Sequence, residues 1–185
     1  MFMSLIKTHI TDPVQTQWCL NKPMIITGYL VALNSFILDI LSKYAAHEWL
    51  RSVPYKSVEI FSFFRITEVW NHGVSFGMLQ AGDDTKLWLL RLLTVGILLF
   101  LFWYHATVSK KTDSYGLALV IGGACGNIYD RFVHGAVYDF LDVILFGWHF
   151  WTFNIADVAI SLGAALMILG QFFFPEKNNK CEQGT

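Results

Sequence analysis

Residues 122–142, GGACGNIYDRFVHGAVYDFLD, decide how this chain folds. The stretch begins as an apolar run rich in small residues and ends in a cluster of charge formed by Asp130, Arg131, Asp139 and Asp142. Small residues let helices pack closely in lipid. Ionisable side chains where a membrane-buried segment leaves the bilayer are costly, and function is their default explanation. The charged half is therefore the first place to look for a functional site.

The composition of the chain is that of a membrane protein. Hydrophobic residues make up 55% of its 185 residues and charged residues only 15%, against about 25% in soluble domains. The formal net charge is −1 and no basic stripe is present, so nothing indicates nucleic-acid binding. The three cysteines are far apart and lack the short ligand spacing of a zinc site. We therefore expect no metal and no cofactor.

Four apolar runs predict four transmembrane helices, because about 20 apolar residues span a bilayer. The runs are residues 23–41, 87–108, 114–129 and 154–174. We expect an α-helical membrane protein with a single domain over residues 1–185.

The section between the first two runs, residues 46–86, is polar and long. Its centre, VEIFSFFRITEVW at residues 58–70, is rich in β-branched and aromatic residues and predicts short strands. We expect a small extracytoplasmic β platform here. After residue 142, the density of Trp and Phe in VILFGWHFWTF is typical of an interfacial aromatic belt.

Short loops predict the orientation of the helices. Lys110 and Lys111 lie in the loop between the second and third runs, and residues 135–153 contain no Lys or Arg. The positive-inside rule then places both termini in the cytoplasm, as an extension at residues 1–22 and a tail at residues 175–185. The basic residues of the platform argue the other way, but a long section can translocate regardless of its charge.

Several polar residues share helix faces near the outer ends of the runs. Asp39 and Lys43 are one turn apart and predict a structural ion pair near the membrane boundary. Asn127, Asp130 and Arg131 share one face of the third run, and Asn154 and Asp157 share one face of the fourth. The topology brings Asp130, Asp139, Asp142 and Asp157 to one membrane surface.

Carboxylates held close together can hydrolyse a peptide bond without a metal. They cannot both ionise easily, so one retains a proton that it can donate to a carbonyl oxygen while the other accepts a proton from water. Two other interpretations stay open from spacing alone. The acids and Arg131 can form a satisfied polar network that closes the bundle, or an ion or proton path in a small translocating membrane subunit.

The chain also resembles the lipoprotein signal peptidase (signal peptidase II) family of bacterial membrane aspartyl proteases. Five motifs carry the resemblance in order: DILSK at 39–43, NHGVSFG at 71–77, GGACGNIYDR at 122–131, GAVYDF at 135–140 and FNIAD at 153–157.

The resemblance implies roles for these residues. It implies that Asp139 and Asp157 are the catalytic pair, that Asn71, Gly73, Asn127, Arg131 and Asn154 line or shape the substrate site, and that Asp39, Lys43 and Asp130 are structural. Gly73 and residues 76–77 would belong to a loop that covers the substrate.

The resemblance also implies a substrate and a location. The substrate would be a diacylglyceryl-modified prolipoprotein, cut on the amino side of its lipidated cysteine. The enzyme would be a monomer in the bacterial cytoplasmic (inner) membrane, in contact with membrane lipid and with its active site near the outer face.

Overall fold

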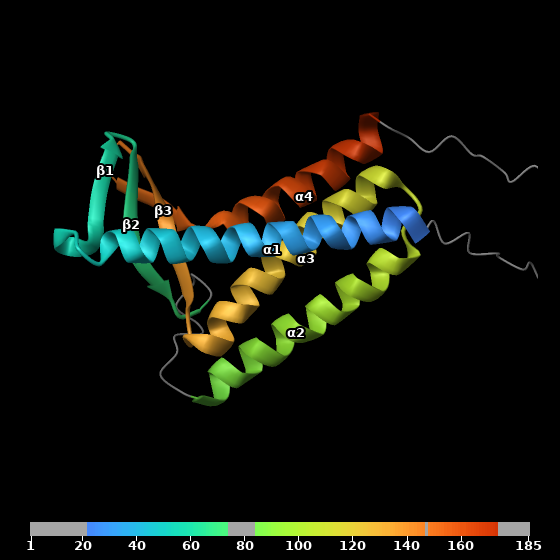
Figure 1. Ribbon diagram of the computed structural model, residues 1–185, viewed down its shortest axis with the longest axis horizontal. Helices are drawn as coiled ribbons and strands as arrows, with labels where there is room; N and C mark the ends of the chain where they lie inside the picture. The colour runs from blue at the N-terminus through green and yellow to red at the C-terminus, as the bar shows by residue number, and fades with distance from the viewer. Residues whose placement is uncertain (1–21, 74–83, 147, 174–185) are drawn as a thin grey trace, which may run out of the picture.

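The computed structural model describes residues 22–73, 84–146 and 148–173, and the bundle of helices carries a sheet at one end (Figure 1). Residues 76–77, the predicted tail at residues 175–185 and all but the last residue of the predicted extension at residues 1–22 lie outside the described residues. Within that part of the chain, the α-helices are α1 (Lys22–Leu50), α2 (Asp84–Thr107), α3 (Lys111–Val133) and α4 (Ile155–Phe173).

Helix α3 is the centre of the bundle and packs against each of the other three helices. Its glycines make this possible. A Cβ atom at Gly122 would meet the backbone carbonyl of Ala32 on α1, and one at Gly123 would meet that of Ala156 on α4. The small residues of the 122–126 stretch therefore allow α1 and α4 to approach adjacent faces of α3 closely.

Among the described residues, three helices are long and apolar enough to cross a membrane, namely Pro23–Leu50, Leu87–Thr107 and Ile155–Phe173. Helix α3, the predicted third span, is long enough, but its glycines and the polar residues at both ends lower its apolar character. The structure thus supports a mostly helical membrane protein with three candidate spans, and a crossing by α3 stays a prediction.

Helix α1 is longer than the apolar run predicts. The run ends at residue 41, yet the helix continues to Leu50. The reason is packing beyond the apolar stretch. Ala46 and Leu50 are buried, and Ala46 packs against Tyr138 and Phe140. Part of the section assigned to the β platform, which was expected to begin at residue 46, is therefore the end of α1.

In the part of the chain that the structure describes, the sheet has four antiparallel strands in the order β1-β2-β3-β4. Its strands are β1 (Ser57–Phe61), β2 (Phe64–Asn71), β3 (Val137–Leu145) and β4 (Trp148–Phe153). The first two confirm the strands expected between residues 58 and 70. The other two come from the segment between α3 and α4, where the density of Trp and Phe predicted only an interfacial belt.

Strand β3 is the structural link between the helices and the sheet. It pairs with β2 on one side and with β4 on the other. Side chains alternate between the two faces of a strand. Tyr138 and Phe140 face the end of α1 in a small core, so Asp139 between them lies on the opposite face. The start of α1 and the end of α4 lie at the end of the bundle opposite the sheet (Figure 1).

Candidate active site

The start of helix α4 carries a reciprocal cap. The Asn154 side-chain oxygen accepts a hydrogen bond from the Asp157 backbone N–H at 3.0 Å. The Asp157 carboxylate in turn accepts from the Asn154 backbone N–H at 3.3 Å. This is the geometry of a capping box, in which the first residue and the residue three positions on satisfy each other's backbone donors. The cap fixes the Asp157 carboxylate at the N-terminus of α4, the positive end of the helix dipole.

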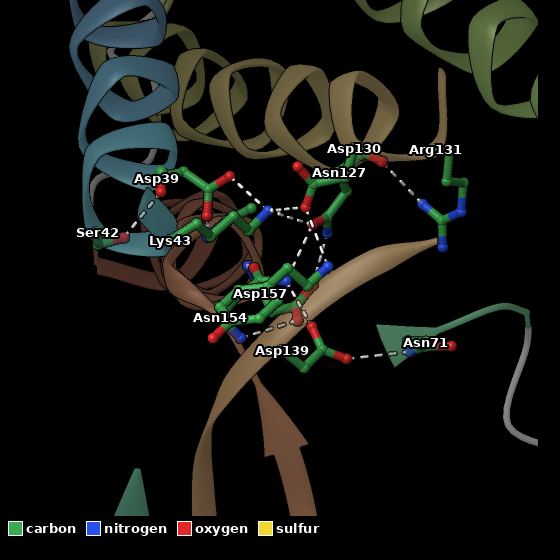
Figure 2. A network of polar contacts seen from close by, with 12 residues as sticks. Asp39, Ser42, Lys43, Asn71, Asn127, Asp130, Arg131, Asp139, Asn154 and Asp157 are labelled. Atoms are coloured by element: carbon green, nitrogen blue, oxygen red, sulfur yellow. Dashed lines mark hydrogen bonds and ion pairs between the residues drawn. The ribbon is translucent and has the colours of Figure 1, made fainter. Parts of the chain in front are cut away.

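Asp139 is held from two sides by side-chain amides (Figure 2). Asn154 Nδ2 donates to Asp139 Oδ1 at 2.6 Å, and Asn71 Nδ2 donates to Asp139 Oδ2 at 3.2 Å. The carboxyl group is buried on β3. Burial and then the charge of Asp157 raise the pKa of Asp139 to about 6, against the opposing hydrogen bonds of the two asparagines. Asp139 is therefore the carboxyl group in this site that can carry a proton near neutral pH.

Asn127 joins this pair of carboxyl groups to the interior of the bundle. Its Nδ2 donates to Asp157 Oδ1 at 2.8 Å. Its Oδ1 accepts from Asn154 Nδ2 at 3.1 Å and from Lys43 Nζ at 3.2 Å. Because one amide contacts residues from α1 and from the start of α4, the position of Asp157 is coupled to the packing of both helices against α3.

A buried triad lies behind the site. Lys43 Nζ is 2.7 Å from Asp39 Oδ2 and 2.8 Å from Asp130 Oδ2, and all three side chains are buried. The ion pair that the 39–43 spacing predicts is present, and Asp130 completes it. Asp39 Oδ1 also accepts the backbone N–H of Ala156 at 2.8 Å, while Asp130 Oδ2 accepts that of Tyr138 at 3.1 Å. The triad therefore ties α1 and α3 to the two segments that carry Asp157 and Asp139.

The other residues expected at the site occupy its border. Arg131 Nη1 donates to the Asn127 carbonyl at 3.4 Å, and its buried Nε has no hydrogen-bond partner among the described residues. The Gly73 backbone N–H donates to Asn71 Oδ1 at 3.2 Å. Asp142 does not join the pair, because it lies three residues beyond Asp139 on β3 and thus on the other face, where Thr152 Oγ1 donates to it at 3.5 Å.

The sequence predicts that four aspartates lie near one membrane surface, and in the structure Asp139 and Asp157 both contact Asn154. Two connections in this network were not predicted. The capping box has a signal in the N-x-x-D spacing of residues 154–157. The contact between Asp39 and the Ala156 backbone has none, because it joins residues 117 positions apart through a backbone atom.

The arrangement provides an acid and a base in one buried polar network. Asp139, with its raised pKa, can donate a proton, and Asp157 at a helix N-terminus can accept one. Within the ranges that the structure describes, no group of three or more His, Cys, Asp or Glu side chains could hold a metal ion.

Comparison with known proteins covers most of the chain. The family model for signal peptidase (SPase) II matches residues 31–173. The lipoprotein signal peptidase of Yersinia pseudotuberculosis serotype O:1b (strain IP 31758) is 41% identical over 167 residues, which cover 86% of this chain and 96% of that protein. The lipoprotein signal peptidase of Yersinia pestis (strain Pestoides F) matches with the same identity and coverage.

Two solved structures, each described as a bacterial membrane enzyme, share the fold and 29% sequence identity. The one at 2.3 Å resolution has a TM-score of 0.62 and covers 86% of this chain and 94% of its own. The one at 1.9 Å resolution has a TM-score of 0.66, and the match covers 80% of this chain and 94% of that structure's chain.

Proposed function

Because this chain belongs to the signal peptidase II family, we propose that it is an aspartyl endopeptidase in which Asp139 and Asp157 together activate a water molecule. The family removes signal peptides from prolipoproteins, so the chain is a protease of lipoprotein processing. This favours a peptidase over an ion-translocating subunit. The observation that carries the proposal is Asn154, whose amide and backbone N–H contact the two carboxyl groups at once.

In the proposed reaction, Asp139 holds the shared proton and Asp157 is ionised. Asp157 takes a proton from water as the water oxygen attacks the peptide carbonyl carbon, and Asp139 gives its proton to the carbonyl oxygen. The resulting diol then collapses. Asp157 passes its proton to the leaving nitrogen, and Asp139 recovers a proton from the diol. Both carboxyl groups return to their starting states, and no covalent intermediate forms.

The asparagines and Arg131 are proposed to orient the substrate and the two acids. Asn71, the last residue of β2, contacts Asp139 and the Gly73 backbone, so a substrate segment that passes the end of β2 would meet both residues. Arg131 has a buried Nε without a partner among the described residues, and this donor could hold a substrate carbonyl. Asn127 and Asn154 hold the carboxyl groups of Asp157 and Asp139 in fixed positions by hydrogen bonds.

The substrate class follows from the family and from the surroundings of the site. We propose that the enzyme cuts diacylglyceryl-modified prolipoproteins before the lipidated cysteine. The apolar side chains of α1, α2 and α4 are exposed around the bundle and could face lipid chains while the peptide bond lies at the network. In this arrangement α3 would be the fourth membrane span and both termini would lie in the cytoplasm. The whole chain would form one monomeric domain, and its sheet would be extracytoplasmic.

The test is cleavage of a lipid-modified prolipoprotein by the purified full-length chain in detergent, with EDTA and with serine- and cysteine-directed reagents present. Asp139→Asn and Asp157→Asn should each reduce turnover by at least about a hundredfold, since a positioned acid or base contributes roughly 10²–10⁴ in rate. Asp113→Asn, at the other end of α3, is the matched control and should retain full activity.

Near-normal turnover in either of the first two variants, at unchanged folding, would show that the dyad is assigned wrongly. Loss of activity with EDTA would argue for a metal-dependent peptidase instead. Proton or ion flux in liposomes without peptide hydrolysis would support the translocating subunit.

A further inference from the structure

Arg91 of α2 holds the backbone of Arg131 at the end of α3. Its Nε and Nη2 donate to the Arg131 carbonyl oxygen at 3.0 Å and 2.6 Å. Carbonyl groups in the last turn of a helix have no donor within the helix and need one from elsewhere. The Asp130 carbonyl accepts the His134 backbone N–H at 2.7 Å, whereas the next carbonyl, that of Arg131, takes its donors from another helix. The start of α2 therefore lies against the end of α3 (Figure 1).

Two aromatic rings hold the Arg91 guanidinium in this orientation. Its Cζ lies 5.0 Å from the ring centroid of Trp88 on α2 and 5.3 Å from that of Phe132 on α3. The rings thus come from the two helices that the guanidinium joins. Aromatic faces attract a guanidinium group, whose planar donors keep a fixed geometry. Arg91 also places a positive charge at the negative end of the α3 dipole.

The residue held in this way, Arg131, is one that the proposed function places at the substrate. Its side chain lies on the same side of α3 as Asp139 and Asn71 (Figure 2), and its charge interacts with those of Asp139 and Asp157. The hydrogen bond from Arg131 Nη1 to the Asn127 carbonyl is long, at 3.4 Å. The position of the guanidinium therefore depends mainly on the helix end from which it extends.

We propose that Arg91 is a positioning residue for substrate binding. By fixing the Arg131 carbonyl, it determines where the Arg131 guanidinium lies relative to Asp139 and Asp157. This inference rests on the proposed function, because it requires that Arg131 contacts the substrate. Helix α2 thereby takes part in substrate binding, although Arg91 itself does not touch the substrate. When Arg91 is replaced, the last turn of α3 loses two donors, and the Arg131 side chain moves with its backbone.

The test is the kinetics of cleavage of a lipid-modified prolipoprotein by the purified full-length chain in detergent, with the unfolding temperature of each variant measured alongside. Arg91→Leu should raise KM about tenfold and change kcat by less than about twofold, because a displaced binding group weakens the binding of substrate. Arg91→Lys keeps the charge and one donor and should raise KM by less than about threefold. Arg51→Leu is the matched control, since Arg51 is exposed and paired with Glu48, and should leave KM unchanged.

A double-mutant cycle with Arg131→Leu separates positioning from a purely structural role. If Arg91 acts through Arg131, adding Arg91→Leu to Arg131→Leu should change KM by less than about twofold. The cycle is repeated as equilibrium binding of the same precursor to the Asp139→Asn protein, which needs no turnover. Trp88→Leu removes one of the two rings beside the guanidinium and should raise KM by about two- to threefold. This variant takes the place of Arg91→Leu if the latter does not fold.

Unchanged KM in Arg91→Leu or in Arg131→Leu overturns the proposal, and so does a lower unfolding temperature of Arg91→Leu with unchanged KM, which indicates a structural contact alone. Multiplicative effects of the two substitutions on KM also overturn it, because Arg91 then acts independently of Arg131.

The Asp139→Asn variant distinguishes a failure of this inference from a failure of the proposed function. If the unmodified chain cleaves the precursor and Asp139→Asn does not, the proposed function stands whichever way Arg91→Leu behaves. If the unmodified chain neither cleaves nor binds the precursor, both proposals are wrong.

Discussion

Replacement of Lys43 with methionine should destabilise the protein more than any other single change to a lysine in the described structure. Lys43 is buried and lies within 2.8 Å of two buried carboxylates. Its removal leaves Asp39 and Asp130 without their shared cation. Breaking a buried pair by removing one partner costs about 3–5 kcal/mol, which lowers the unfolding temperature of a chain of this size by roughly 6–20 °C.

The matched control is Lys56→Met. Lys56 also contacts a carboxylate, that of Glu68 at 2.5 Å, but its side chain is 51% exposed. An exposed pair contributes about 0–1 kcal/mol, so the unfolding temperature should change by no more than roughly 4 °C. Both variants are measured by thermal unfolding in the same detergent at the same scan rate.

A second substitution sharpens the test. In Lys43→Met with Asp130→Asn, Asp39 keeps its hydrogen bond from the Ala156 backbone, and the net charge of the triad returns to −1. The double variant should recover part of the lost stability. The electrostatic account of the triad is refuted if Lys43→Met and Lys56→Met lower the unfolding temperature equally. It is also refuted if Asp130→Asn lowers the stability of the Lys43→Met variant as much as it lowers that of the unmodified protein.

Three further predictions concern the network around the dyad. The folded-state pKa of Asp139 is raised to about 6 from an ordinary 3.8, so its contribution to stability is present at low pH and is lost as the pH rises from about 4 to 6. Above pH 6 the buried, ionised Asp139 carboxylate destabilises the fold. Asp139→Asn removes this cost and should raise the unfolding temperature at pH 8 by an amount equivalent to at most about 3 kcal/mol, with no gain at pH 4. A gain at pH 4 as large as the gain at pH 8 contradicts this. Gly126→Ala places a Cβ against the Asp39 carboxylate and should destabilise the folded protein by roughly 1–3 kcal/mol. Gly96→Ala, with open space around it, should leave the unfolding temperature unchanged in the same thermal unfolding measurement. Asn154→Ser keeps an acceptor for the helix cap but loses the amide that holds Asp139, so it should lower the cleavage rate strongly and the stability little. Asn154→Ala should lower both, the stability by about 0.5–2 kcal/mol. Equal unfolding temperatures of the two variants contradict the role of Asn154 as a cap.

Sequence patterns predicted the helices and the family well, for physical reasons. Apolar runs report directly on burial in lipid, and three of the four predicted spans are confirmed as candidates. The family match confirms the resemblance that five motifs indicate. Polar residues spaced one turn apart, such as Asp39 and Lys43, predicted the ion pair that is present.

Long-range contacts were the part that the sequence could not predict. Strand β3 alternates only weakly, because most of its side chains are buried on both faces, so it lacks the pattern of a strand with one solvent face. The partnership of Asp130 with Lys43 rather than with Arg131 depends on how α1 and α3 pack. The catalytic roles of Asp139 and Asp157 rest on the family resemblance and stay predictions.

The basic residues of the sheet region, which conflicted with the predicted orientation, have local partners. Arg51 pairs with Glu48, and Arg65 with Glu59. Burial raises the pKa of Glu68, but its hydrogen bond with Lys56 and the charge of that residue outweigh this and hold the pKa below its ordinary value. These pairs balance the charge of the folded region. The predicted orientation still depends on the short loops, because Asp and Glu contribute little to the positive-inside rule and long sections translocate regardless of charge.

The buried triad also bears on how the chain enters a bilayer during synthesis. Asp39 and its cation lie on the same helix, so α1 can leave the translocation machinery already neutralised. The ion pair of Asp130 on α3 with Lys43 forms only when α3 and α1 associate. An unpaired carboxylate in lipid is costly, and α3 is the least apolar of the proposed spans. If α3 crosses the membrane, its insertion therefore depends on α1 being in place first, and the order of the helices along the chain provides for this.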